Sequence, residues 1–568
     1  RRSLLKGAAL SAASVAALGM IGCAPKEAGS ADDAKAGAAG GADGKHTWEV
    51  KPEPIPADKV KETVDTEVLV IGGGYSGTCC ALAAAEGGAK VTLVEKDAML
   101  NGHGVGGTGA IGSRELDKLG ISFDKPVEME RWVSTCGNRC RESLVAKWFR
   151  ESERCMNWFL DLAEKNGAKC MVTVGSRSAV HPEIDCYHMI SGGEIFEQHT
   201  MADFVEYLFE SEAKQHGAEF VYEMPAVQLV QDDAGKVTGA IFEADGGYVQ
   251  VDAAKGVLLT TGGYTSNAEM LRACNPMVDR CVTLQYGSPN NVGEGIKAGM
   301  WAGAQKDSIG APMIFDRGAV KPGENAGIIS SPGETATFVG TDKQFNLGSQ
   351  PLMKVTRDGK RFVNESTPYD FCCFAAAEHE GGVFCQVFDS NLKEDVKRFN
   401  TIGCSRQTQQ LLAKEADTPL DEIYADQLEK GTMVKADTIE ELAVKLGFSG
   451  EAKDAFLAEV EKYNGFYDAQ EDPDFGKEAY RLSELRTAPF YGIWYGGSLL
   501  TTVDGLRINE DMQVLNAESQ PIEGLYAAGD CSGSIFGNNY PEYIVGCACG
   551  RTITFARHAV RHMVGDLS

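Results

Sequence analysis

Three glycines near the start of the folded part of the sequence have the spacing of a turn that binds a pyrophosphate. Gly72, Gly74 and Gly77 follow an apolar run at 68–71 and precede an alanine-rich stretch, so we expect a strand, a tight turn and a helix. The first glycine permits the bend, the second lets the backbone approach the phosphates, and the third lets the helix pack on the sheet. The helix N-terminus then faces the anion. The sequence therefore predicts a dinucleotide site at this turn.

An acidic residue in the next expected strand supports this interpretation. Glu95 ends a second apolar run downstream of the glycines, where a carboxylate can accept hydrogen bonds from ribose hydroxyls. Tyr75 and Ser76 lie inside the turn, and Lys96 follows the acid directly. We therefore include these three side chains in the predicted cofactor site.

Three further segments resemble the fumarate reductase and succinate dehydrogenase flavoprotein family: 259–264, 291–296 and 524–530. The resemblance spans about residues 67–563 and implies FAD rather than NAD. It also implies that Asp530 binds the ribityl chain and that the last helix directs its N-terminus at the flavin, where its dipole would stabilise the reduced anion. On this resemblance we assign to FAD binding Gly102, Gly107, Thr108, Gly109, Ala226, Thr261, Gly262, Gly529 and Ile544.

His103 leaves the mode of flavin attachment open. Its segment, Gly102-His103-Gly104-Val105, is similar to the family segment whose histidine carries the flavin covalently. Soluble exported members of the family usually bind FAD noncovalently and lack this histidine. We expect noncovalent FAD, with covalent attachment through His103 as the alternative.

Three positions that are charged in the family are neutral in this sequence. The proton-donor arginine corresponds to Tyr369, a substrate-clamping arginine to Tyr540, and a histidine to Thr501. A dicarboxylate needs guanidinium or imidazolium groups to replace its water, and tyrosine cannot supply that charge. We therefore expect a substrate other than fumarate.

The two tyrosines resemble those of the 3-ketosteroid dehydrogenase branch, which handles neutral enones. That branch has Gly-Pro-Gly after the second tyrosine, and this chain has Glu542-Tyr543-Ile544, which argues against a steroid pocket. Tyr187 is a candidate partner of Tyr369, and we expect His188, beside Tyr187, on the surface.

These resemblances predict an exported flavin reductase that acts on a carbon–carbon double bond conjugated to a carbonyl. Reduced FAD would give hydride from N5, and Tyr369 would supply the proton, since a phenol with a pKa of about 10 can protonate a strongly basic carbanion. Tyr540 and backbone N–H groups of the last helix would hold the substrate oxygen. One alternative is a 3-ketosteroid-type dehydrogenase that forms the double bond, and another is a noncatalytic flavin- and ligand-binding lipoprotein.

An α/β fold must position these residues: a Rossmann-like FAD-binding domain of the glutathione-reductase type with an inserted α+β capping domain. We expect the FAD-binding domain at 62–270 and 495–566 and the cap at 271–494. Periodicity predicts helices, a hairpin and a closing helix. The helices are expected at 145–166, 201–215, 439–446 and 452–469, the hairpin at 237–251, and the closing helix runs to about 563.

The N-terminus resembles an export signal. Arg1-Arg2 precedes a modest apolar run that ends at Cys23, similar to a twin-arginine signal with a lipoprotein cleavage site. Residues 24–61 contain few large apolar residues and predict a flexible tether. We expect export by the twin-arginine pathway, with the signal at 1–23, and a lipid anchor at Cys23 on the outer face of the cytoplasmic membrane.

The net charge and the cysteine pattern of the sequence limit which macromolecules and cofactors we expect the protein to bind. The 568 residues carry a formal charge of −27, which argues against nucleic acid and suits a basic redox partner. The 17 cysteines include no Cys-x-x-Cys-His, so we expect no covalent c-type haem, while an iron–sulfur cluster built from dispersed cysteines stays open. We expect no other metal. With no haem motif and no recognisable FMN domain, a separate cytochrome or membrane donor would supply the electrons.

Overall fold

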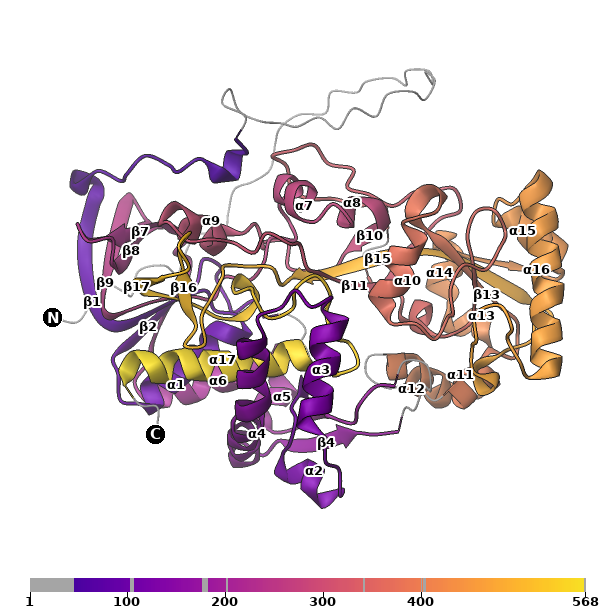
Figure 1. The fold of residues 1–568 in the computed structure, drawn as a ribbon, viewed down its shortest axis with the longest axis horizontal. Coiled ribbons are helices and arrows are strands. Elements are labelled where there is room, and N and C mark those ends of the chain that lie inside the picture. Colours follow the sequence, from indigo (N-terminus) through magenta and orange to yellow (C-terminus); the bar gives the residue numbers. More distant parts are fainter. Residues whose placement is uncertain are drawn as a thin grey trace.

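The computed structural model describes residues 45–102, 107–175, 182–200, 203–340, 343–399, 401 and 405–565. These residues form two lobes side by side along the long axis of the molecule (Figure 1). An eight-stranded sheet builds the first lobe and a six-stranded sheet the second, and a three-stranded sheet completes the first. Because the central strands of the first sheet are parallel and helices cover it, the predicted α/β fold is confirmed.

The parallel strands of the first sheet all end at one edge. Its order is β16-β17-β9-β1-β2-β6, with β7 and β8 continuing from β9. In register, Ile71 of β1 pairs with Val94 of β2 and Leu259 of β9, and Leu259 pairs with Ala527 of β17. The segments that follow these strands therefore meet at the carboxyl edge of the sheet, where α/β folds bind ligands. The strands are β1 (Val60–Ile71), β2 (Val91–Val94), β6 (Glu219–Val221), β7 (Ala226–Gln231), β8 (Val237–Ala244), β9 (Gly247–Leu259), β16 (Gln513–Leu515) and β17 (Pro521–Ala527).

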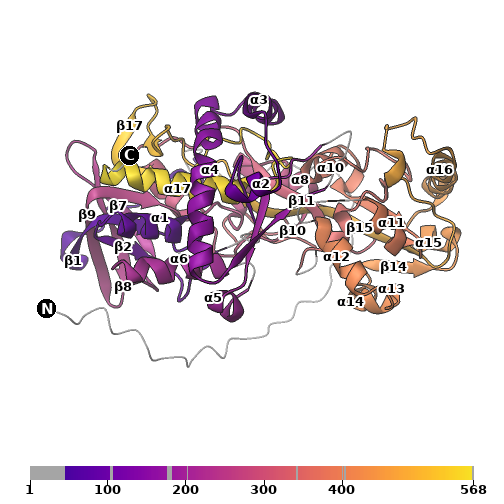
Figure 2. The same cartoon turned by 90° about the horizontal axis from the view of Figure 1, so that it is seen from below.

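Helix α1 packs against both α6 and α17 beside this sheet (Figure 1). Helix α1 is buried along almost its whole length, because its small side chains let it pack closely between its neighbours. The amphipathic α4 crosses α17, as Figure 2 shows from below. The helices of this lobe are α1 (Tyr75–Glu86), α2 (Arg114–Lys118), α3 (Lys125–Thr135), α4 (Glu142–Lys165), α5 (Glu194–Gln198), α6 (Phe204–Gln215) and α17 (Cys547–Val564), and the small sheet contains β3 (Thr108–Gly109), β4 (Lys169–Thr173) and β5 (Tyr187–Ser191).

The second lobe, which we call the cap, is a sheet with a hydrophobic core on each face. Along β15, Tyr491, Ile493 and Tyr495 face one core, while Phe490 and Trp494 face the other. This alternation follows the two-residue repeat of a strand. The strands are β10 (Val282–Gln285), β11 (Pro312–Val320), β12 (Met353–Val355), β13 (Phe384–Phe388), β14 (Met433–Ala436) and β15 (Phe490–Thr502).

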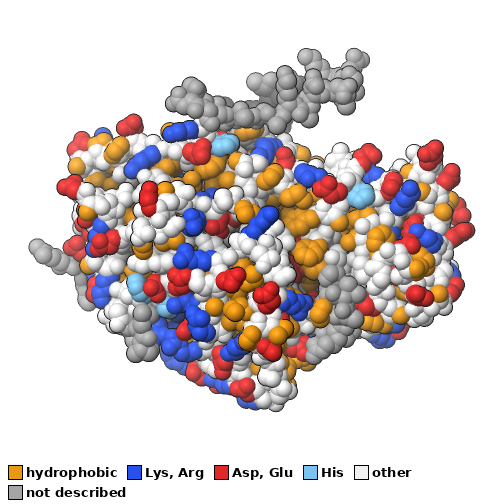
Figure 3. Space-filling model, in the orientation of Figure 1, with side chains coloured by type: hydrophobic (Ala, Val, Ile, Leu, Met, Phe, Trp, Pro, Cys, Tyr) orange, Lys and Arg blue, Asp and Glu red, His pale blue; other side chains and the backbone are white. Residues whose placement is uncertain are grey.

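Several helices pack against the cap sheet or connect it to the first lobe. They are α7 (Ala268–Cys274), α8 (Val278–Cys281), α9 (Glu294–Trp301), α10 (Tyr369–Ala376), α11 (Leu392–Phe399), α12 (Arg406–Lys414), α13 (Leu420–Ile423), α14 (Ala425–Lys430), α15 (Ile439–Lys445) and α16 (Gly450–Ala469). Acidic side chains gather at the far end of the cap, over α15 and α16 (Figure 3).

The elements predicted from periodicity are confirmed: α4, α6, α15, α16 and α17 lie where helices were expected, and β8 and β9 form the hairpin. Strand β15 runs past residue 494, the expected end of the cap, and its last residues still pair with strands of the cap sheet. The domain boundaries themselves stay predictions.

The predicted signal and Cys23 lie outside the described residues, so export and lipid anchoring stay predictions. Residues 47–49, within the expected tether, contact α7 and α9: the Thr47 N–H donates to Glu269 Oε1 at 3.0 Å, and Trp48 is buried. The Trp301 indole donates to the carbonyl of Trp48 at 3.1 Å. Among the described helices, none combines the length and the apolar character that crossing a membrane requires.

Candidate active site and cofactor cavity

The turn between β1 and α1 has the geometry that its glycines predict. Gly72 has a φ of +105°, and a Cβ there would lie 2.7 Å from the carbonyl oxygen of Thr260. A Cβ at Gly77 would lie 1.8 Å from the carbonyl oxygen of Gly72. A Cβ at Gly74 would come only within 3.6 Å of Asn101. Gly72 and Gly77 are therefore required by packing, while Gly74 leaves its backbone open to the cavity.

Glu95 lies at the end of β2, beside this turn. Its Oε2 accepts the Gly73 N–H at 2.5 Å, and its Oε1 accepts the Asp97 N–H at 2.9 Å. Burial raises the pKa of this carboxyl above its ordinary range, and the two N–H donors oppose the shift. The carboxylate oxygens line the same cavity as the glycine turn, where they can accept hydrogen bonds from a sugar.

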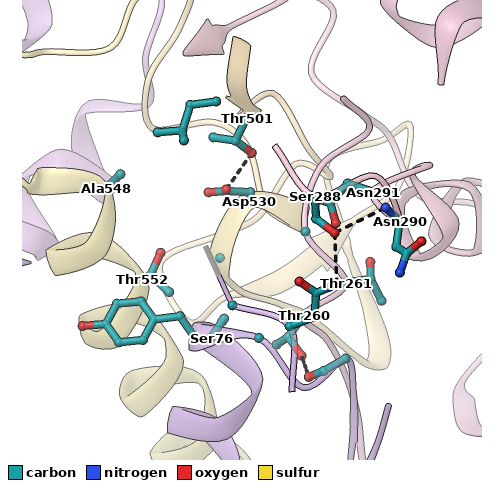
Figure 4. Close-up of a pocket in the computed structure, with 18 of the residues that line it drawn as sticks. Ser76, Thr260, Thr261, Ser288, Asn290, Asn291, Thr501, Asp530, Ala548 and Thr552 are labelled. Atoms are coloured by element: carbon teal, nitrogen blue, oxygen red, sulfur yellow. Dashed lines mark hydrogen bonds between the residues drawn. The ribbon is translucent and has the colours of Figure 1, made fainter. Parts of the chain in front are cut away.

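One cavity of ≈ 760 Å³ runs along the carboxyl edge of the first sheet and continues under the cap. Figure 4 shows Ser76 on α1 and Ala548 and Thr552 on α17 on one side of it, and the loop with Ser288, Asn290 and Asn291 on the other. Most of the residues predicted to bind the cofactor line this cavity. They are Gly72, Gly74, Tyr75, Ser76, Glu95, Lys96, Gly102, Gly107, Ala226, Thr261, Gly262, Gly529 and Asp530.

Four of the predicted residues lie behind the wall and shape it. Gly77 packs α1 on its own turn, and Thr108 contacts the Tyr75 hydroxyl at 3.1 Å. The Gly109 N–H donates to the Gly546 carbonyl at 2.8 Å, and Ile544 is fully buried. His103 lies outside the described residues, so both modes of flavin attachment stay open.

Asp530 is held from two sides at the cavity wall. Its Oδ2 accepts the Thr501 hydroxyl at 2.7 Å (Figure 4), and its Oδ1 accepts Arg551 Nη2 at 3.1 Å. Arg551 is fully buried, so this ion pair is screened little by water. Asp530 is thereby fixed with its carboxylate at the cavity.

These residues fit an FAD. The glycine turn and the first turn of α1 supply N–H groups and a positive dipole end for a pyrophosphate. The Glu95 and Asp530 carboxylates can accept hydrogen bonds from the ribose and ribityl hydroxyls. The start of α17, with Ala548 at the cavity, supplies a second positive dipole end for the ring system.

Tyr369 lies at the cap side of the cavity, as the first residue of α10. Its hydroxyl is 2.6 Å from Ser405 Oγ, and its backbone N–H donates to Glu542 Oε2 at 2.9 Å. Its ring packs edge-on against Phe315, with centroids 5.2 Å apart. Both ends of Tyr369 are therefore fixed, one by the cap and one by the first lobe.

Tyr540 faces the same cavity from the first lobe. Its ring is 8% exposed, and its hydroxyl accepts the Ala548 N–H at 3.2 Å. Burial raises the pKa of this phenol well above its ordinary range, so it stays protonated at neutral pH. The fold brings Tyr369 and Tyr540 to one cavity. The catalytic roles expected for them stay predictions.

Two cations that sequence reasoning missed also line the cavity. Arg317 on β11 is 2% exposed, and its Nε donates to Ser349 Oγ at 2.7 Å. Its guanidinium lies 4.5 Å from the Phe315 ring centroid and 4.9 Å from that of Tyr369. Lys343 is the second cation. The cavity therefore carries positive charge although Tyr369, Tyr540 and Thr501 are neutral.

The sequence does contain a signal that could have indicated Arg317: it is a charged residue within a largely apolar strand. Residues 312–320 form a strand that is buried throughout, and a charge is retained in such a run only when partners or a ligand compensate its burial. The neighbouring Asp316 pairs with Lys354 at 2.9 Å.

The expectation of a surface position for His188 is wrong. His188 is fully buried, with Nε2 2.7 Å from Ser113 Oγ and Nδ1 2.9 Å from the Cys186 carbonyl. Burial lowers its pKa to about 4, so the ring is neutral at neutral pH.

Tyr187 lines the cavity between Gly107 and Gly546. Among the described residues, no group of three or more His, Cys, Asp or Glu side chains is placed to hold a metal ion.

Comparisons with known proteins agree with this geometry. The model of the FAD binding domain family matches residues 67–542. A vinyl phenol reductase from Lactiplantibacillus plantarum is 26% identical over 505 residues, which are 87% of this chain and 96% of that protein. A probable fumarate reductase, Ifc3, from Shewanella frigidimarina is 28% identical over 90% of this chain and 80% of its own length.

A solved structure shares the fold. The 3-ketosteroid Δ1-dehydrogenase of Sterolibacterium denitrificans superposes with a TM-score of 0.68 at 18% identity, over 88% of this chain and 99% of its own. The fold and the cavity define an FAD-dependent flavoprotein, and the chain belongs to the FAD binding domain family. It is an FAD-dependent oxidoreductase that is similar to fumarate reductases.

Proposed function

We propose that this enzyme reduces a carbon–carbon double bond conjugated to a carbonyl or carboxyl group. The observation that carries the proposal is the position of Tyr369, a fixed phenol beside the buried Arg317 in the wall of the FAD cavity. Two related proteins, an NADH:acrylate oxidoreductase and a urocanate reductase, support a double bond conjugated to a carboxyl group, and the vinyl phenol reductase supports a carbon–carbon double bond as the target.

Tyr369 supplies the proton in this proposal. FAD, when bound and reduced, supplies a hydride to the polarised double bond. The Tyr369 phenol then protonates the neighbouring carbon, and the added hydride and proton complete a two-electron reduction. Ser405 Oγ, 2.6 Å from the phenol oxygen, orients this hydroxyl. Positioned general acids of this kind contribute about 10²–10⁴-fold to a rate.

Tyr540 and Arg317 stabilise the substrate oxygen. Charge builds on that oxygen as the double bond accepts the hydride, so donors already aimed at it lower the barrier. Tyr540 keeps its proton because burial raises its pKa, and can donate it in a hydrogen bond. Arg317 adds a full positive charge, which admits a carboxylate as well as a ketone.

A separate donor, a cytochrome or a membrane protein, supplies the electrons. The acidic surface of the cap (Figure 3) suits a partner with a basic surface, since complementary charge speeds encounter. We place the enzyme on the outer face of the cytoplasmic membrane, exported through the twin-arginine pathway and anchored at Cys23, on the resemblance of its N-terminus to such signals.

Anaerobic reoxidation of the reduced holoenzyme tests the proposal. Reduced protein is mixed with a panel of enones, enoates, aromatic acrylates and fumarate, and flavin absorbance is followed. We expect rapid reoxidation by at least one conjugated alkene and slow reoxidation by fumarate. Failure of every alkene would overturn the proposal and favour a protein that only binds flavin and ligand.

A dehydrogenase that forms the double bond is the second candidate. The pairing of Tyr369 with Tyr540, which resembles that of 3-ketosteroid dehydrogenases, favours it. Turnover of the alkene with a reduced viologen as electron donor is compared with turnover of the saturated compound with an oxidised electron acceptor. Faster turnover in the second assay would assign the dehydrogenase direction.

A further inference from the structure

Two carboxyl groups, the buried Asp370 and the half-buried Glu542, lie where the cap contacts the first lobe. Glu542 follows Tyr540 and lines the cavity, and Asp370 is the second residue of α10. Asp370 is 2% exposed; its Oδ1 accepts the Phe371 N–H at 2.9 Å, while its Oδ2 has no hydrogen-bond partner among the described residues. Neither carboxyl has a role in the chemistry described above.

Glu542 makes a contact that joins the two lobes. Its Oε2 accepts the backbone N–H of Tyr369 at 2.9 Å across 173 residues of sequence. The first N–H groups of a helix have no partner within the helix, so a side-chain acceptor is needed there. This acceptor comes from the segment that carries Tyr540, so one hydrogen bond sets the position of Tyr369 relative to Tyr540.

The two carboxyls also influence each other's protonation. Burial raises the pKa of Glu542 well above its ordinary range, and the charge of Asp370 raises it further. Burial likewise raises the pKa of Asp370 to about 7. Two interacting carboxyls that are partly removed from water do not both ionise readily, so the pair keeps a proton to a higher pH than an isolated carboxyl would. The charged and titratable groups that face the pair are Asp316 and Arg317 on β11, Cys547 on α17, Cys281 on α8, and Cys136 at the end of α3.

We propose that Glu542 is a positioning residue that fixes Tyr369 against the Tyr540 segment through the hydrogen bond to the Tyr369 N–H, and that it does so while Glu542 or Asp370 carries a proton. The inference rests on the proposed function and deepens it. While one of the two carboxyls is protonated, Glu542 accepts the Tyr369 N–H without charge repulsion from Asp370. Loss of the last proton leaves two like charges at the junction of the lobes, and their repulsion displaces α10 and the phenol.

Four variants of the holoenzyme separate the hydrogen bond from the charge. Glu542→Ala removes both, Glu542→Gln keeps an oxygen acceptor without the charge, and Asp370→Asn removes the second carboxyl. Glu523→Gln is the matched control, because Glu523 is an exposed residue of the first lobe paired with Lys236. The measured quantities are kcat and KM for the best alkene of the panel as functions of pH.

We expect a fall in kcat of about tenfold to 100-fold for Glu542→Ala with little change in KM, because misplacing a reacting group by about 1 Å costs up to roughly 10²-fold. Glu542→Gln recovers most of the rate. In the parent enzyme kcat falls on the alkaline side of neutrality, and both Glu542→Gln and Asp370→Asn lose this fall. Parent-like kcat and pH profile in Glu542→Ala would overturn the proposal.

A spectroscopic readout keeps the inference separate from the proposed function. Infrared spectra of the oxidised holoenzyme report the carbonyl stretch of a protonated carboxyl. We expect such a band to disappear as the pH rises through neutrality, and to lose this pH dependence in both Glu542→Gln and Asp370→Asn. A band that is unchanged in both variants contradicts a protonated carboxyl at this pair, even if no alkene in the panel reoxidises the flavin.

Discussion

Replacing Tyr369 with phenylalanine removes one oxygen atom and, with it, the proposed proton donor. The ring keeps its edge-on contact with Phe315 at 5.2 Å and its place beneath Arg317. The backbone hydrogen bond to Glu542 does not involve the hydroxyl. The variant therefore isolates the chemical role of the phenol.

The expected magnitudes differ between chemistry and stability. A general acid contributes about 10²–10⁴-fold, which at about 1.36 kcal/mol per tenfold is about 2.7–5.4 kcal/mol of barrier. The lost hydrogen bond to Ser405, 2.6 Å from the hydroxyl, is worth about 1 kcal/mol of folding free energy. A folded holoenzyme with a rate lowered by at least about 100-fold is the expected result.

The assay is a single turnover of reduced holoenzyme with saturating alkene, followed by stopped-flow absorbance of the flavin. Tyr467→Phe, on α16 of the cap, is the matched control and should react at the parent rate. Tyr540→Phe should also slow the step, by roughly 10²–10³-fold, because it removes a donor to the substrate oxygen. A Tyr369→Phe rate within a few-fold of the parent would refute the assignment of this phenol as proton donor.

Three further outcomes are expected. Arg317→Met should lower kcat/KM for an enoate by roughly 10–100-fold relative to a matched enone, since a hydrogen bond to a charged group is worth about 1.5–3 kcal/mol; equal losses for both substrates would contradict a charge role. Gly77→Ala should yield protein without bound flavin, measured by the ratio of flavin to protein absorbance, because the new Cβ would lie 1.8 Å from the Gly72 carbonyl oxygen. The pKa of Asp370 is raised to about 7 in the folded protein, against about 4 in the unfolded chain. The proton on Asp370 therefore stabilises the fold fully below about pH 4, and this stabilisation is lost as the pH rises through about 7. The melting temperature of the holoenzyme should therefore fall between mildly acidic and neutral pH, and an identical fall in Asp370→Asn would argue against this origin.

The cofactor half of the site could be predicted from the sequence because its signals are local. The strand, the turn at Gly72 and the first residues of α1 are adjacent in the chain, and backbone sterics alone require glycine where φ is +105°. Glu95 was found because it ends the next strand of the sheet. Helices such as α4 and α17 repeat their apolar residues with the helical period, which is also a local property.

Residues on the substrate side of the cavity were predicted only where this sequence has a different residue type at a position of a segment that resembles the family. Tyr369 and Tyr540 were found in this way, and the fold brings both to one cavity. Arg317 was missed, because a charged residue in an apolar strand gives no indication of which cavity it will face. His188 was misplaced for a related reason: its buried partners, Ser113 and the Cys186 carbonyl, compensate a polar ring that composition alone assigns to the surface.

The sequence by itself determined the class of cofactor, the α/β architecture and the two phenols, because each depends on short stretches of chain. Only the tertiary structure placed Glu542 against Tyr369, Ser405 against the phenol, and Arg317 in the same wall. These contacts join segments far apart in the chain. The Glu542 contact exists because the cap packs on the first lobe, and the other two exist because the cap folds around its own sheet. Burial at that junction also sets the protonation of Glu542 and Asp370, and no local pattern of residues encodes burial.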